Sequence, residues 1–425
     1  MLRLVLLLLL GGTHATHFLG TMMTYYPKQI NTDGTVMVSF RYKLGFTSCI
    51  HSDMWYCSPY CGSLNPTLQQ IDLEPSGEWC QREGTMTTVI NPSFVTQLEF
   101  AGGNWIWEIR NNVVSWRALT FVEPGKRSDT RKPNVSPQST IIPAVRVPSN
   151  CQRDFNLMAF DPDGDKVECR FGSDSLNECW PCAPPSVLNL SSTCTLSFNR
   201  TNSTDEGSYA VQLVLEDFPQ QTITLTRVNG VQETKTTSQA ISKIPLQFVL
   251  HVDPVVPSCT EGLFLPKFLP PTPANRAKLS TKVNQPLKIS IAAEAANATI
   301  SELLFSGPAN AFKNSSGSGN FTLTWTPSVS EEGESHPICF IVQAMLNSQK
   351  YHSELRCVIV QVEFGLVARV NMKVLTSLSP GGSVNEVVLQ KIKEELVSLG
   401  LPSNSSLLVL KSSSRPANAT ATSGV

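Results

Sequence analysis

Residues 194–216 read CTLSFNRTNSTDEGSYAVQLVLE, and residues 321–344 read FTLTWTPSVSEEGESHPICFIVQA. Both stretches begin with a Thr-Leu-Ser/Thr-aromatic segment, pass through an acidic Glu-Gly turn, and end in an apolar alternating run. Alternation with a period of two is typical of a β-strand that has one face in the core. Because the whole strand-turn-strand pattern recurs, it predicts two copies of one structural unit.

A second short sequence also occurs twice, once before each copy of this pattern. VPSNC (147–151) returns as VPSC (256–259), each time at the start of a new block. We therefore predict two copies of one β-sandwich of about 100 residues, at 149–253 and 254–364.

The N-terminal part has a similar pattern. TVMVSFRYKL (35–44) alternates, and NWIWEIRNNVVSWRALTFV (104–122) is predicted to be a hairpin with its turn at Asn111-Asn112. The tryptophans on its arms are expected to pack in the core or across strands: Trp105, Trp107 and Trp116. Residues 16–123 are thus predicted to form an N-terminal β-sandwich that carries disulfides, and the fold class is mainly β.

Residues 124–148 depart from the strand pattern. They are rich in proline and polar residues, which predicts an exposed linker. The Lys126-Arg127 and Arg131-Lys132 pairs could be processing sites or a basic patch, and solvated linker residues are the favoured interpretation.

The C-terminal end differs again. VARVNMKVLTSL (367–378) and SSLLVLKSSS (405–414) read as strands, and SVNEVVLQKIKEELVSLGL (383–401) has the capping box and apolar stripe of a helix. We predict a small β-α-β segment at 365–413, followed by a disordered stalk at 414–425.

The first fifteen residues, which include MLRLVLLLLL, have the charge and leucine run of a secretory signal peptide. The run is too short to span a bilayer, so we expect a secreted chain that is membrane-anchored only if a longer form exists. With a net charge of −1 and no block of one sign, nothing points to nucleic acid. Nine Asn-x-Ser/Thr sequons predict N-glycosylation of exposed loops: Asn134, Asn189, Asn199, Asn202, Asn297, Asn314, Asn320, Asn404 and Asn418.

Twelve cysteines in a secreted chain favour disulfides over zinc or redox chemistry, despite the Cys57-x3-Cys61 and Cys179-x2-Cys182 spacings. A bridge between Cys339 and Cys357 across a hairpin is the first choice, which leaves Cys259 to pair with the second block. The blocks contain, in order, Cys49, Cys57, Cys61 and Cys80; Cys151, Cys169, Cys179, Cys182 and Cys194; and Cys259, Cys339 and Cys357.

The stretch FDPDGDKVEC (160–169) places three aspartates at alternate positions, Asp161, Asp163 and Asp165. The first interpretation is a tight turn on Pro-Asp-Gly. The second adds calcium, which needs six to eight oxygens, and a later strand end with Asp217 could supply more. Catalysis is disfavoured, because no motif for a metalloprotease, a serine hydrolase or a phosphate loop is present.

Two resemblances bear on these segments. FDPDGDKVEC followed by EGSYAVQLVLEDFP resembles the Asp-rich turn and Gly-x-Tyr strand of cadherin-like and Ig-like extracellular modules, and FTLTWTPSVSEEG resembles a strand and turn of the same class. The chain is also similar to a group of secreted or cell-surface fish glycoproteins that share VPSNC, DPDGD and LPKFLPPTP. These resemblances imply tandem Ig-like or cadherin-like β-sandwiches outside the cell.

The expected function is binding or adhesion through an extracellular protein or glycan partner, without catalysis. No cofactor is expected, with Ca²⁺ as the exception to test. The alternatives are a structural component of an extracellular matrix or mucosal coat and, remotely, a hydrolase.

Overall fold

The computed structural model describes residues 17–58, 67–91, 96–228, 230–364, 390–396 and 398. The chain divides into two units, residues 1–365 and 366–425. The predicted signal peptide, the two C-terminal strands and the stalk lie outside the described residues. The described part of the predicted 383–401 helix is helical. Among the described helical residues, no segment is long and apolar enough to cross a membrane.

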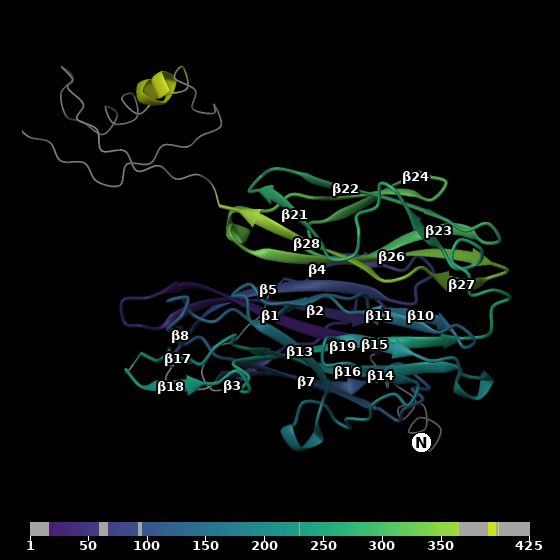
Figure 1. The fold of residues 1–425 in the computed structure, drawn as a ribbon, viewed down its shortest axis with the longest axis horizontal. Coiled ribbons are helices and arrows are strands. Elements are labelled where there is room, and N and C mark those ends of the chain that lie inside the picture. Colours follow the sequence, from purple (N-terminus) through teal and green to yellow (C-terminus); the bar gives the residue numbers. More distant parts are fainter. Residues whose placement is uncertain are drawn as a thin grey trace, which may run out of the picture. The chain divides into compact units, whose positions relative to one another are not determined.

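The third block is a two-layered β-sandwich (Figure 1). One layer has the order β20-β22-β25-β24, and the other has the order β21-β28-β26-β23, with β27 paired to β26. Its core contains buried Phe305, Trp325 and Phe340. The elements are β20 (Lys267–Leu269), β21 (Ala277–Lys282), β22 (Leu287–Glu294), β23 (Thr299–Ser306), β24 (Phe312–Gly317), β25 (Asn320–Trp325), the 3₁₀ turn η3 (Val329–Glu331), β26 (Ser335–Leu346), β27 (Gln349–His352) and β28 (Arg356–Glu363).

The second block repeats this plan. One layer is β11-β15-β14, and the other places β10, β19, β16 and β13 side by side. The elements are β10 (Ala144–Pro148), β11 (Arg153–Asn156), β12 (Ala159–Phe160), β13 (Lys166–Phe171), η1 (Asp174–Leu176), β14 (Leu188–Leu190), β15 (Thr195–Phe198), η2 (Ser203–Asp205), β16 (Gly207–Phe218), β17 (Ile223–Thr226), β18 (Gln232–Lys235) and β19 (Lys243–Asp253).

The internal repeat is confirmed by strand pairing. The Thr-Leu-Ser/Thr-aromatic segments are β15 and β25, the acidic turns contain η2 and η3, and the apolar runs are β16 and β26. In each sandwich an early strand also pairs in parallel with the last one: β10 with β19, and β21 with β28. The fold class is therefore mainly β, with tandem Ig-like sandwiches.

The N-terminal block shares a sheet with the second sandwich. Both β1 and β7 hydrogen-bond to β19, which gives the order β3-β6-β7-β19-β1-β2-β5-β4. Alternating apolar residues explain the long central strands, because Val36, Val38 and Phe40 all face the core. The strands are β1 (Phe18–Ile30), β2 (Val36–Phe46), β3 (Tyr56–Ser58), β4 (Gln69–Leu73), β5 (Cys80–Ile90), β6 (Thr96–Asn104) and β7 (Ser115–Val122).

The prediction of an exposed linker over 124–148 is wrong. This segment contains β8 (Lys126–Arg127), β9 (Gln138–Ser139) and β10, and most of its residues are buried. Pro137 and Pro143 directly precede β9 and β10, and the three short strands pair with β17, β12 and β19. Arg127 is only 1% exposed, whereas Lys126, Arg131 and Lys132 are exposed as predicted.

The predicted 104–122 hairpin is misplaced. The paired arms are β6 and β7, and residues 105–114 are the loop that joins them. This loop docks on the second sandwich, because Asn111 donates to the carbonyls of Ala183 and Ala210 and accepts from the Ala210 amide. Trp105 and Trp116 are buried as predicted, whereas Trp107 is 74% exposed.

The third sandwich packs on the N-terminal block through polar contacts. Asp72 on β4 accepts from the Phe305 amide at 3.0 Å and pairs with Lys313 at 2.8 Å. Lys43 on β2 donates to Thr140 and Ser306. Asp72 and Lys43 are buried and hydrogen-bonded, so they fix the two parts in one arrangement.

Disulfides reinforce the array. The predicted bridge across the hairpin, Cys339–Cys357, is present. The predicted bridge from Cys259 to the second block is present too, and its partner is Cys151. Cys57 is disulfide-bonded as well. The remaining described bridges are Cys49–Cys80, Cys169–Cys194 and Cys179–Cys182.

Candidate cation site

The acidic stretch between β12 and β13 forms a tight turn, as predicted. The Gly164 amide donates to the Asp161 carbonyl at 3.2 Å, and Gly164 has a φ of 89°, which suits glycine. Asp161 Oδ1 accepts from the Asp163 amide at 2.8 Å. This side-chain bond holds the turn and leaves Asp161 Oδ2 free to face the neighbouring carboxylates.

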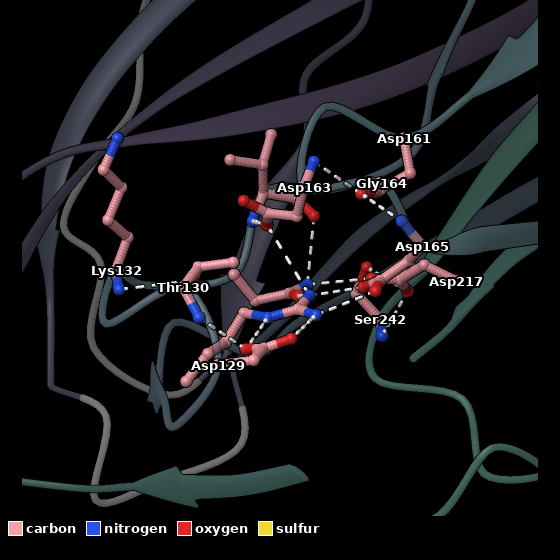
Figure 2. Close-up of polar contacts among 12 residues, drawn as sticks. Asp129, Thr130, Lys132, Asp161, Asp163, Gly164, Asp165, Asp217 and Ser242 are labelled. Carbon is pink, nitrogen blue, oxygen red and sulfur yellow. Dashed lines mark hydrogen bonds and ion pairs between the residues drawn. The ribbon is translucent and has the colours of Figure 1, made fainter. Parts of the chain in front are cut away.

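Asp217 reaches the same place from the end of β16. It is fully buried, and its Oδ1 accepts from the amide and hydroxyl of Ser242 at 2.6 and 2.8 Å. Its Oδ2 accepts from Asn134 Nδ2 at 2.8 Å. Figure 2 shows Asp161, Asp165, Asp217 and Ser242 converging in this way. The adjacent Glu216 does not join them, because it pairs with Arg170 and Lys243 instead.

Arg127 lies among the carboxylates. Its guanidinium forms a fork with Asp165, bonds both oxygens of Asp129 at 2.8 and 3.0 Å, and donates to Asn134 Oδ1 at 2.6 Å. Such bidentate pairs are strong and geometrically specific. Burial disfavours the charge, yet the bonds to Asp165 and Asp129 raise the pKa of Arg127 above its ordinary value.

Sequence reasoning missed Arg127, Asp129, Asn134 and Ser242. Three of them lie in 124–148, whose composition predicts a linker, and Ser242 directly precedes β19. Nothing in the sequence around Arg127, where Lys126, Arg131 and Lys132 are also basic, indicates a partner for the Asp-rich turn.

The acidic groups resist ionisation. Burial, and then the charges of Asp217 and Asp163, raise the pKa of Asp161 well above its usual range. Burial raises the pKa of Asp217 to about 7, although the hydrogen bonds from Asn134 and Ser242 oppose the shift. Burial also raises the pKa of Asp163. The cluster is therefore suited to hold a proton or a cation.

Three of the four predicted carboxylate ligands are placed so that they could bind a hard cation such as Ca²⁺. Asp161, Asp165 and Asp217 each offer a carboxylate oxygen, and these oxygens lie within 4.8 Å of one another. Asp161 Oδ2 is buried and has no hydrogen-bond partner. The fourth predicted ligand, Asp163, does not converge with them, because its Oδ2 accepts from the Val135 amide at 2.8 Å and faces Arg127 at 3.7 Å.

One sequon does not lie on an exposed loop, although the sequence predicts this for all nine. Asn134 is fully buried, and both ends of its amide are engaged, so it has no room for a glycan. Six other sequon asparagines are exposed: Asn189, Asn199, Asn202, Asn297, Asn314 and Asn320. Asn404 and Asn418 lie outside the described residues.

The comparisons with known proteins identify no family. No protein-family model matches the sequence, and no curated protein matches it. Among solved structures, an endo-fucoidan hydrolase of glycoside hydrolase family 107 is 13% identical with a TM-score of 0.19, over 74% of this chain and 39% of the hydrolase. The chain thus spans about two fifths of that protein.

Two further solved structures match this chain over most of their own length. The sialic acid binding region of a Streptococcus sanguinis adhesin is 13% identical with a TM-score of 0.21, over 63% of this chain and 88% of the adhesin region. The tandem Ig repeats of Dlar are 12% identical with a TM-score of 0.19, over 53% and 95%. Scores this low carry no argument about function, so the class, tandem Ig-like β-sandwiches, rests on the strand pairing described above.

Proposed function

We propose that this chain is an extracellular glycoprotein that works by binding a protein or glycan partner, and not by catalysis. The observation that supports the proposal is that a disulfide and buried polar contacts fix the third sandwich against the second sandwich and the N-terminal block. The Cys151–Cys259 bridge and the buried contacts of Asp72 and Lys43 fix the third sandwich against the rest. A fixed array of disulfide-bonded sandwiches with exposed sequons suits recognition, because loops on a rigid frame lose little entropy on binding.

The experiment is a binding assay with the secreted chain. The protein is expressed in animal cells, fused to an antibody Fc region, and tested on a panel of cell surfaces and on an immobilised glycan panel. Saturable binding that free chain competes away supports recognition. Assembly of the purified chain into filaments or insoluble material would instead support the structural alternative, and turnover of a polysaccharide would revive the hydrolase.

A second candidate property is calcium binding by Asp161, Asp165 and Asp217. The observation that favours it is the buried, unpartnered Asp161 Oδ2 beside two other carboxylates. A calcium ion would replace the proton that this cluster otherwise holds, so binding would release protons and weaken at lower pH.

Calorimetry on the full secreted chain tests this property. At about 1 mM Ca²⁺, within the range of extracellular modules, we expect heat, proton release and a higher melting temperature. Asp161→Asn removes the response, whereas Asp154→Asn, an exposed position on β11, keeps it. No heat and no melting shift in the unmodified chain would leave the turn and its Arg127 network alone.

A further inference from the structure

Strand β27 of the third sandwich carries a buried histidine where all three blocks meet. β27 packs against β10 of the second sandwich (Figure 1), and the turn between β4 and β5 of the N-terminal block reaches the same place. His352 is 3% exposed. The Arg153 guanidinium of the second sandwich donates to the carbonyls of His352 and Ser353 at 2.9 and 2.6 Å, so β27 is held from outside its own sandwich.

The hydrogen bonds around His352 fix its ring in a neutral form. Burial opposes the charge of Glu74, yet hydrogen bonds from Lys350 and Ser76 lower its pKa to about 2, so it can only accept. The Gln343 amide therefore turns Nε2 toward Glu74 at 3.2 Å and Oε1 toward His352 Nε2, also at 3.2 Å. The ring donates its one proton there. Its Nδ1 is buried without a hydrogen-bond partner, so a second proton would be a buried charge with no acceptor.

The bases that face His352 from the packed elements also oppose a charge on its ring. Burial, and then the repulsion from Arg146 and Arg153, lower the pKa of His352 well below its ordinary value. The folded junction therefore keeps the ring neutral at pH values where a solvated histidine is charged. The contributing bases are Arg146 on β10, Arg153 on β11, His251 on β19 and Lys350 on β27.

The acids of the junction are already paired with these bases. Neither ring nitrogen of His352 contacts a carboxylate, since one bonds Gln343 and the other has no partner. A proton taken up by His352 in the folded junction would thus meet no adjacent counter-charge. The ion pairs are Lys350 with Glu74 and Glu78 at 2.9 and 2.8 Å, and Arg146 with Glu78 and Asp253 at 2.5 and 2.6 Å.

We propose that His352 is an acid sensor for the contact between the third sandwich and the rest of the array. When the third sandwich moves away, water reaches the ring, and the ring titrates as an ordinary histidine. Acid then favours the open arrangement, because only that arrangement takes up the proton. The Cys151–Cys259 bridge keeps the two sandwiches joined during such an opening. This inference goes beyond the proposed function and does not depend on it.

Two other groups of the junction titrate on opening. Burial lowers the pKa of His251, so His251 reinforces the effect. Burial raises the pKa of Asp253 to about 6, which acts in the opposite direction, because the closed junction then holds a proton that the open junction releases. The cluster around Asp217 does not enter, since its hydrogen-bond partners lie within the second sandwich and the segment that leads into it. A variant of His352 alone therefore isolates the sensor.

Hydrogen exchange on the full glycosylated chain, read at single amides by mass spectrometry, tests the inference. Apolar contacts such as that of Ile71 keep openings rare, and hydrogen exchange detects rare openings. The Phe305 amide is the reporter, because it donates across the contact to Asp72 at 3.0 Å. From pH ~7.5 to pH ~5, after correction for intrinsic exchange, its opening constant should rise about 30-fold more in the unmodified chain than in His352→Gln. Glutamine keeps a donor for Gln343 but does not titrate.

His51→Gln is the matched control, because His51 lies in the loop after β2, and it should behave like the unmodified chain. Amides of β16 and β22, which pair within their own sandwiches, should show no such rise. Equal pH dependence in the unmodified chain and His352→Gln excludes the sensor. Faster exchange of β16 and β22 in step with Phe305 also excludes it, since that pattern indicates global unfolding.

A second measurement needs no variant and keeps the inference testable if His352→Gln fails to fold. Exchange of the C2 hydrogen of each imidazole ring, followed by mass spectrometry across pH, gives the titration of each histidine in the unmodified chain. His352 should stay neutral down to pH values well below the ordinary range of histidine. If His352 titrates within that range while the Phe305 amide remains protected, the inference is overturned.

Discussion

At the scale of single residues, Arg127 and Asn134 make the acidic turn part of a buried polar network. Alone, Asp161, Asp163 and Asp165 read as a solvated corner. In the folded chain, a buried guanidinium neutralises Asp165, and a buried amide joins Arg127 to Asp217. The turn is thus part of the core polar structure of the second sandwich.

The raised carboxyl pKa values make stability depend on pH. Burial raises the pKa of Asp217 to about 7 and that of Asp161 well above its usual range, whereas an unfolded aspartate titrates near ~4. Between those values the folded chain binds more protons than the unfolded chain, so its free energy of unfolding falls as pH rises. We expect Asp161→Asn to flatten this slope and, at pH ~7.5 in a chelator, to increase stability by about 1–3 kcal/mol.

Urea unfolding at several pH values measures both effects, with Asp154→Asn as the exposed control. A variant that is less stable than the unmodified chain at neutral pH, in the absence of metal, would show that the Asp161 charge is needed and would contradict the burial argument.

Asn134 provides a second residue-scale expectation. Glycopeptide mapping of the secreted chain should find Asn134 unmodified, because both of its amide ends are used internally. Asn134→Ala should lower the free energy of unfolding by about 2–4 kcal/mol, since it leaves a buried arginine and a buried aspartate each short of a partner. Asn199→Ala, at an exposed sequon, should change it little. A glycan found on Asn134 in folded protein would overturn this picture.

At the scale of elements, edge strands explain where some sequons lie. β14 and β24 are the last strands of their sheets, and each carries an exposed sequon asparagine, Asn189 and Asn314. A free edge offers unpaired backbone groups to other chains, and natural proteins block such edges. A glycan on each of these strands would serve that purpose.

We therefore expect Asn189→Gln/Asn314→Gln to aggregate more readily than the unmodified chain. Light scattering during incubation near the melting temperature measures this. Asn297→Gln is the matched control, because Asn297 lies in the turn between β22 and β23, away from the edge. Equal aggregation of all three proteins would rule out edge protection by these glycans.

At the scale of the whole molecule, disulfides and non-covalent contacts together hold the sandwiches and the N-terminal block in one array. Cys151–Cys259 closes a separation of 108 residues, whereas Cys179–Cys182 closes one of 3. In the chain-entropy account, the long loop constrains the unfolded chain far more. Ile71 of β4 also inserts into the core of the third sandwich, which ties that sandwich to the N-terminal block without a covalent bond.

Replacing both Cys151 and Cys259 by serine should therefore lower the free energy of unfolding by about 4–5 kcal/mol. The matched replacement of Cys179 and Cys182 should have a much smaller effect. Denaturant unfolding measures the difference. If both replacements lower the free energy of unfolding equally, the bridges stabilise through contacts in the folded state. They would then not stabilise by lowering the entropy of the unfolded chain.

The local and repeated features could be predicted from the amino-acid sequence. Two-residue alternation located the long strands, and the recurring strand-turn-strand pattern identified two sandwiches of one topology. Cysteine arithmetic identified the Cys339–Cys357 bridge, and the odd counts in the second and third blocks indicated that Cys259 pairs with a cysteine of the second block; that this partner is Cys151 came only from the fold. These features depend on residues close in sequence or on counting, so a single chain suffices to find them.

The sheet shared by the blocks and the burial of the polar cluster could not be predicted in this way. The pairing of β1 and β7 with β19, the burial of Arg127 and Asn134, and the exposure of Trp107 all depend on segments far apart in the chain. Proline-rich composition suggested a solvated linker, but such a segment becomes buried when folded neighbours supply its hydrogen bonds. An Asp-rich turn, likewise, is a solvated corner or a buried polar cluster according to which side chains the fold brings against it.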